Sequence, residues 1–329
     1  MEMRVALADV ARSRSGRIAL TAVAGALITV VAFVVASRLA ATPWPLSRGN
    51  PGLLIAACGL SALGYTLKAY GWGRLFAADE RPRPLALAAA LGGASISAIA
   101  LPGRFDDVVR IAIVRRFRNC PAGVRPLCLS LVMLGLIDAI ALAPFAFAAA
   151  LLPGHAMAIR VGLVFLAVVG LAAAVVVLAM PGMAASGLVL RFRLGRWLRP
   201  RTTSPRDALG ALVLVSACWM SRIVGLFLLL GALGVGFSFT LALLFLCASS
   251  AAAALPVGPG GTATQAGAGA AVLIASGIGA SEAFAVAFAS QVLGLLVGGA
   301  ILLLATVWRT GVRLAPRFRA AAPAALSQS

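Results

Sequence analysis

Six long apolar runs recur along the sequence and leave the chain very few possible folds. They cover roughly residues 18–38, 52–71, 127–151, 158–180, 208–232 and 283–308. Each has the approximately 20 residues that a helix needs to cross a bilayer. Only 11% of the residues are charged, against about 25% in soluble domains. The runs do not alternate as the strands of a membrane barrel do, so we predict an all-α polytopic membrane protein with six full transmembrane helices.

Two further apolar segments, about 85–101 and 239–255, end at proline and glycine. The first break is Leu101-Pro102-Gly103, and the second spans Pro256 to Gly261. A second helical piece is expected after each break, over about 104–118 and 262–278. The first of these pieces is rich in arginine and aspartate and cannot lie against lipid. We therefore predict two re-entrant helical hairpins, 85–118 and 239–278, each of which enters and leaves on one side.

The basic residues predict an orientation. With the N-terminus inside, 23 of the 28 lysine and arginine residues, Lys68 and Arg110 included, fall in inner segments, and only Arg38, Arg48 and Arg160 fall in outer ones. This asymmetry follows the positive-inside rule and accounts for the net charge of +19 without nucleic acid as a partner. Both termini are then inside, as a basic N-terminus (1–17) and a basic, disordered tail (309–329).

The order of the predicted elements indicates a repeat. Two spans, a hairpin and a span occur twice, over about 18–151 and 158–308, and the second copy starts on the opposite side. Inverted repeats of this kind are common in secondary transporters, whose binding sites form at discontinuous helices near the midplane. The sequence therefore predicts a single transmembrane domain, residues 18–308, with a site between the two breaks.

The residues around the breaks suit an anion. If both hairpins reach the middle of the membrane, two helix N-termini point inward and attract negative charge. Arg104 has the planar fork that grips phosphate, and Gly260 and Gly261 permit the second turn. Alternatively, Asp106 and Asp107 cap the first helix and pair with Arg110 and Arg104. Gln265 lies in the pattern Thr262-Ala263-Thr264-Gln265, which is also typical of a helix-capping box.

Two charged residues lie in the middle of predicted spans. Asp138 is in the third span and Arg222 is in the fifth. Because each is costly in lipid, we expect both to face the protein interior. They are predicted to pair with each other or with the cluster Arg104–Asp107, either as a proton relay or as an interhelical tie. The candidate substrate-binding residues are therefore Arg104, Asp106, Asp107, Arg110, Asp138, Arg222, Gly260, Gly261 and Gln265.

The sequence offers few histidine and cysteine residues for a metal site or for acid–base catalysis. The only histidine, His155, lies in a short Pro-Gly-His loop, and none of the five cysteines forms a Cys-x-x-Cys pair. We therefore expect no metal, no cofactor and no catalytic activity. An enzyme acting on lipid stays an alternative, and its candidate groups are Asp106, Asp107 and Asp138.

The two breaks resemble the motifs of a known family. Residues 101–110 look like the Leu-Pro-x-Arg-x-Gly-Glu-x-x-Arg motif of the lysylphosphatidylglycerol synthase transmembrane (flippase-like) family, with Asp106 for Gly and Asp107 for Glu. Pro256 to Gly261 resembles the second motif, although Ala263 replaces its last glycine and its glutamate is missing. Asp138 matches an aspartate of the intervening span. The resemblance implies flipping of phospholipids or polyprenyl phosphates. The soluble aminoacyl-transfer domain of the synthases is not found in the sequence, so synthase activity is not expected.

These observations together predict a lipid flippase-like transporter of the cell membrane with a phosphate-binding cavity at the midplane. Its expected partners are anionic or phosphate-bearing lipids. Two alternatives remain open. One is a small-solute secondary transporter, and the other is a non-transporting partner subunit of an envelope-lipid or glycan enzyme.

Overall fold

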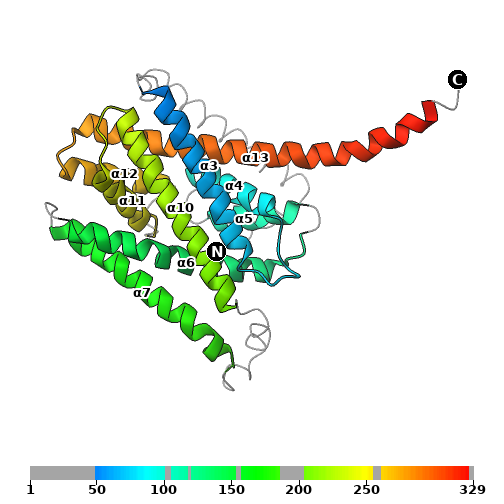
Figure 1. Cartoon of the computed structure of the whole chain (residues 1–329), viewed down its shortest axis with the longest axis horizontal. Coiled ribbons are helices and arrows are strands. Elements are labelled where there is room, and N and C mark those ends of the chain that lie inside the picture. Colours follow the sequence, from blue (N-terminus) through cyan, green and yellow to red (C-terminus); the bar gives the residue numbers. More distant parts are fainter. Residues whose placement is uncertain are drawn as a thin grey trace, which may run out of the picture. The chain divides into compact units, whose positions relative to one another are not determined.

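The computed structural model describes residues 49–100, 105–117, 120–152, 157–185, 204–254 and 261–325 (Figure 1). Within these ranges the regular elements are all helices. In chain order they are α3 (Pro51–Gly73), α4 (Pro84–Ala100), α5 (Phe105–Arg116), α6 (Val124–Leu151), α7 (Met157–Ala185), α10 (Pro205–Ala232), α11 (Phe239–Ala254), α12 (Gly261–Ala275) and α13 (Ala280–Ala325).

Five of these helices are long and apolar enough to cross a membrane. They are α3, α6, α7, α10 and the part of α13 from Ala280 to Trp308. Each coincides with a span predicted from the sequence, and the first predicted span, 18–38, lies outside the described residues. The all-α, multi-pass membrane architecture is thus confirmed for this part of the chain.

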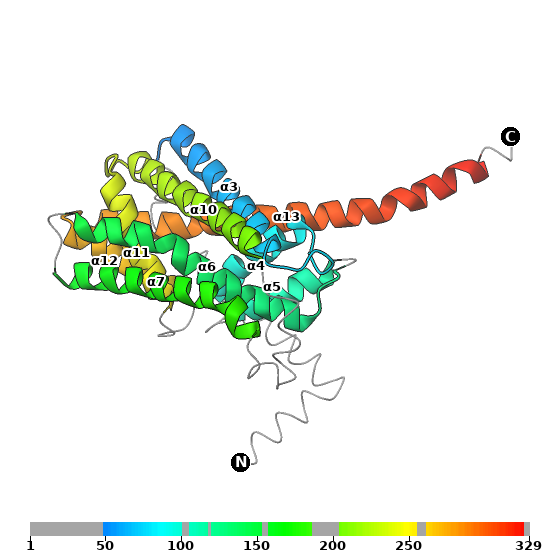
Figure 2. The same cartoon turned by 60° about the horizontal axis from the view of Figure 1, so that its bottom comes forward.

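The shorter helices occur as two packed pairs, α4 with α5 and α11 with α12 (Figures 1 and 2). The helices that were predicted on either side of each break are therefore present and lie against one another. The turns themselves, 101–104 and 255–260, lie outside the described residues. In α5, Asp106 and Asp107 occupy the first turn and Arg115 and Arg116 the last turn. This is the order of charge that stabilises a helix dipole.

Helix α13 continues past the predicted end of the last span. It runs without interruption to Ala325. The predicted tail, which begins at residue 309, is therefore a helical continuation of the last span as far as Ala325. Residues 326–329 lie outside the described part of the chain.

The central packing joins helices that are far apart in the sequence. Helix α3 lies along α10, α4 along α13, and α6 contacts α7, α10 and α11. Two glycines allow α4 and α13 to pack closely, because a Cβ at Gly92 of α4 would overlap the backbone of Gly298 in α13. Small residues at such crossings let helix backbones approach closely inside membranes.

We expect Gly92→Val to lower the free energy of unfolding by about 1–3 kcal/mol, the usual cost of overpacking a tight contact. The added methyl groups would push α4 away from α13. Thermal unfolding of the purified protein in detergent measures the effect. Gly135→Val in α6 is the matched control, since a Cβ there meets nothing within 4 Å, and equal losses in the two variants would contradict the expectation.

Candidate functional site

Seven helices line a cavity of about 310 Å³. Its lining comes from α3, α4, α5, α10, α11, α12 and α13. The first turn of α5 contributes Asp106, and the start of α12 contributes Gln265. The polar and charged residues of the lining are Ser61, Tyr65, Lys68, Ser95, Asp106, Arg110, Arg222, Ser249, Ser250, Gln265, Ser290 and Gln291.

One face of α3 supplies four of the lining residues. Ser61, Gly64, Tyr65 and Lys68 occupy positions i, i+3, i+4 and i+7, so they lie on the same side of the helix. Lys68 falls within the predicted span 52–71, which α3 confirms, but the sequence did not single it out as a site residue, although it lines the cavity. The polar spacing along the span is the signal that could have identified it.

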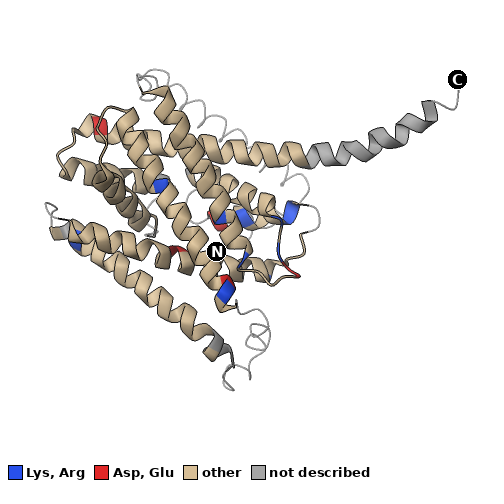
Figure 3. Cartoon of the chain, viewed as in Figure 1, with Lys and Arg blue, Asp and Glu red and all other residues tan. Residues whose placement is uncertain are grey.

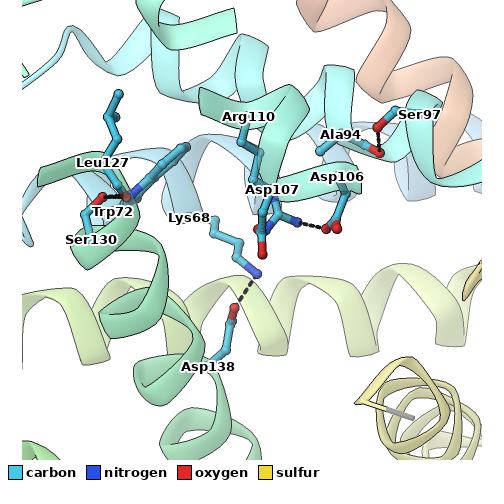
Figure 4. Close-up of polar contacts among 10 residues, drawn as sticks. All are labelled: Lys68, Trp72, Ala94, Ser97, Asp106, Asp107, Arg110, Leu127, Ser130 and Asp138. Atoms are coloured by element: carbon cyan, nitrogen blue, oxygen red, sulfur yellow. Dashed lines mark hydrogen bonds and ion pairs between the residues drawn. The ribbon is translucent and has the colours of Figure 1, made fainter. Parts of the chain in front are cut away.

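Asp138 of α6 forms an ion pair with Lys68 (Figure 4). The distance from Lys68 Nζ to Asp138 Oδ2 is 2.6 Å, and the two side chains are only 19% and 22% exposed. The other carboxylate oxygen, Oδ1, accepts a hydrogen bond from Trp219 Nε1 at 3.2 Å. The predicted pairing of Asp138 with Arg222 is therefore not the one that the structure has. Lys68 and Trp219 already occupy both oxygens, and Asp138 itself does not line the cavity.

Arg222 instead packs against an aromatic ring. Its guanidinium carbon lies 4.9 Å from the centre of the Trp219 ring, in a cation–π contact. Lys68 Nζ lies 6.0 Å from the same ring. Among the residues that the structure describes, no carboxylate is within ion-pair distance of Arg222. The side chain of Arg222 is exposed and contributes to the cavity wall.

On α5, Arg110 lies between two carboxylates (Figure 4). Its guanidinium is 2.9 Å from Asp106 Oδ2 and 2.6 Å from Asp107 Oδ1. The predicted pairing of Asp106 with Arg110 across one helical turn is confirmed. The Nε atom of Arg110 is buried and has no hydrogen-bond partner within the described ranges. Arg104, the predicted partner of Asp107, lies outside those ranges.

The second break is described from Gly261, the first residue of α12. Thr262 is thus in the first turn and not at the predicted cap position, and Gln265 lines the cavity. Ser249 of α11 donates a hydrogen bond to the backbone carbonyl of Gln265 at 3.0 Å, which ties the two helices together. Gly260 lies outside the described residues.

The charges of the cavity are unevenly compensated. Lys68 is held by Asp138, and Arg110 is held by two aspartates, whereas Arg222 faces the cavity without a carboxylate in the described part of the chain. Apart from the charged residues named above, those of α5, α6, α7 and α10 lie in the first or last turn of their helices (Figure 3). An uncompensated guanidinium in a membrane interior is costly unless an anion reaches it. The arrangement therefore favours an anionic ligand at Arg222.

In the ranges that the structure covers, no three histidine, cysteine, aspartate or glutamate side chains are grouped as a metal site requires. The lining offers arginine, lysine, amide and hydroxyl groups, which are suited to binding oxygen-rich ligands.

Comparison with known proteins gives one informative result. Neither the curated proteins nor the solved structures include a match to this chain. Residues 17–316, nearly the whole sequence, match the family described as lysylphosphatidylglycerol synthase TM region. The five candidate spans, the two pairs of short helices and this match lead to the same conclusion: the chain is a multi-pass membrane protein that belongs to the lysylphosphatidylglycerol synthase TM-region family.

Proposed function

We propose that the cavity binds the phosphate-bearing headgroup of an anionic membrane lipid, and that the protein carries this headgroup between the two leaflets of the cell membrane. One observation carries the proposal. Arg222 lines the cavity, is exposed and has no carboxylate partner among the described residues. Guanidinium matches the geometry of phosphate oxygens and can bind two of them at once.

The size of the cavity supports a headgroup as the ligand. Its volume of about 310 Å³ is near the lower end of small-molecule sites, which run from about 300 to 1,000 Å³. A phosphate with a small substituent fits this space, and the acyl or prenyl chains remain in the bilayer. The amide groups of Gln265 and Gln291 supply further donors in the same lining.

The helix packing supports transport between leaflets. In a two-fold repeat α3 corresponds to α10, the pair α4–α5 to α11–α12, and α6 to α13. The contacts follow this correspondence, since α3 packs on α10, α4 packs on α13 and α11 packs on α6. In this proposal the two short pairs are re-entrant hairpins from opposite leaflets, and the site lies between them, as in other inverted-repeat transporters.

Chemistry on the lipid is not part of the proposal. Asp106, Asp107 and Asp138, the carboxylates considered as catalytic groups, are all engaged in ion pairs. A soluble phosphate ester is the second candidate ligand, because a cavity of this size would also accept one.

Reconstitution tests both candidates. Native mass spectrometry of the purified protein is expected to show phosphatidylglycerol bound, and vesicles that contain the protein are expected to expose inner-leaflet labelled phosphatidylglycerol to an external quencher. Soluble glycerol phosphate is expected to compete weakly. If glycerol phosphate binds and the lipid does not, the small-solute reading replaces the proposal. If neither binds, the anion site itself is rejected.

A further inference from the structure

Four side chains from three helices form one connected cluster at the wall of the cavity. Lys68 of α3 pairs with Asp138 of α6, and Asp138 accepts a hydrogen bond from Trp219 of α10. The Trp219 ring forms a cation–π contact with Arg222. Lys68 and Arg222 line the cavity, whereas Asp138 and Trp219 do not. The two cations are therefore available to a ligand, and Asp138 and Trp219 contact them from outside the lining.

Within this cluster, the two cations differ in what already binds them. Lys68 is neutralised by Asp138 at 2.6 Å, and Arg222 has only the Trp219 ring. The third cation of the lining, Arg110, is shared by two carboxylates. Among the described residues of the lining, Arg222 is thus the one cation that has no carboxylate partner.

We propose that Asp138 is a specificity-determining residue. By keeping Lys68 occupied, it makes the cavity prefer a phosphodiester headgroup, which carries one negative charge, over a phosphate monoester. The inference rests on the proposed function and names the class of lipid that the same site selects. In this proposal Asp138 acts on the ligand through Lys68 and does not contact the ligand itself.

The preference follows from the energy of the ion pair. A phosphate monoester carries a charge of about −1.5 to −2 at neutral pH, so it needs a second cation to be fully compensated. If a ligand drew Lys68 away from Asp138, the carboxylate would lose its counterion. This loss is unfavourable because the two side chains are only about one-fifth exposed. Trp219 keeps the carboxylate in place through its other oxygen. A phosphodiester is compensated by Arg222 alone and leaves the ion pair intact.

The wild-type protein provides the first test. Native mass spectrometry in detergent at pH 8 compares phosphatidylglycerol with phosphatidic acid of identical acyl chains, because the monoester is then close to dianionic, its second pKa being about 6. We expect tighter binding of phosphatidylglycerol. Equal binding, or tighter binding of phosphatidic acid, overturns the inference and leaves the proposed function standing. Failure to bind either lipid overturns both.

Variants then identify the residue responsible. Asp138→Asn keeps an acceptor for Trp219 but releases Lys68, so the affinity for phosphatidic acid relative to phosphatidylglycerol is expected to rise about tenfold, the value of one charge-assisted contact. Lys68→Met/Asp138→Asn removes the released cation and is expected to restore the wild-type ratio. Asp138→Glu is expected to keep it.

A purely structural role would not change this ratio, because a loosened fold weakens both lipids together. An unchanged ratio in Asp138→Asn, or an equal rise in the double variant, overturns the inference. If the single variant does not fold, the wild-type comparison and the double variant, in which no charge is left unpaired, still decide it.

Discussion

Arg222→Gln is expected to weaken binding of phosphatidylglycerol by about 2–3 kcal/mol, roughly 30- to 150-fold. Glutamine keeps a donor of similar reach but loses the charge and the two-pronged fork of arginine. Because Arg222 has no carboxylate partner among the described residues, its removal leaves no opposite charge stranded. The fold should therefore tolerate the change. Lipid titration by native mass spectrometry gives the affinity, and thermal unfolding gives the stability.

Two controls separate a binding role from a general effect of charge. Arg222→Lys keeps the charge without the fork and is expected to lose only part of the affinity. Arg160→Gln removes an exposed arginine near the start of α7, a helix that contributes nothing to the described lining, and is expected to bind as the wild type does. Normal binding by Arg222→Gln would refute the assignment of phosphate to this residue.

The spans were predictable because their signal is local. A helix that crosses lipid must satisfy its backbone internally and be apolar over about 20 residues, and both requirements can be read along the sequence. The predicted 208–232, for example, is found as Pro205–Ala232. The helix begins three residues before the predicted start. The hydroxyl of Ser204 caps it by accepting a hydrogen bond from the Asp207 backbone N–H at 3.1 Å.

Contacts within one helix were also predictable. Asp106 and Arg110 are one turn apart, so their pairing needs no knowledge of the fold. The pairing of Asp138 depends on which helices meet. Its partner Lys68 comes from α3, a helix that also packs along α10, and no spacing in the sequence records that contact. Lys68 was counted with the charges of an inner segment because it lies close to the end of its predicted span.

The remaining lining was missed for a related reason. Gln291 and Ser290 lie in α13 and are ordinary polar residues of a long apolar helix. They become part of a site only because α13 packs against α4 and α12. Their neighbours on the helix give no pattern like that of Ser61, Tyr65 and Lys68, so a sequence reading has no reason to select them.

The ion pair between Lys68 and Asp138 has a second expected consequence, for stability. Lys68→Met leaves the Asp138 carboxylate with one hydrogen bond from Trp219. Removing one partner of a buried pair costs about 3–5 kcal/mol. Because these side chains are 19% and 22% exposed, we expect a smaller loss, about 2–4 kcal/mol. Thermal unfolding in detergent measures it.

The double variant Lys68→Met/Asp138→Asn distinguishes the worth of the pair from the cost of breaking it. Asparagine still accepts the Trp219 hydrogen bond, and no charge remains unpaired, so most of the lost stability is expected to return. This recovery would mean that the pair adds little to folding and is retained for the charge it sets in the cavity, as buried polar pairs in some proteins are. A double variant as unstable as Lys68→Met would show instead that the pair is a structural tie between α3 and α6.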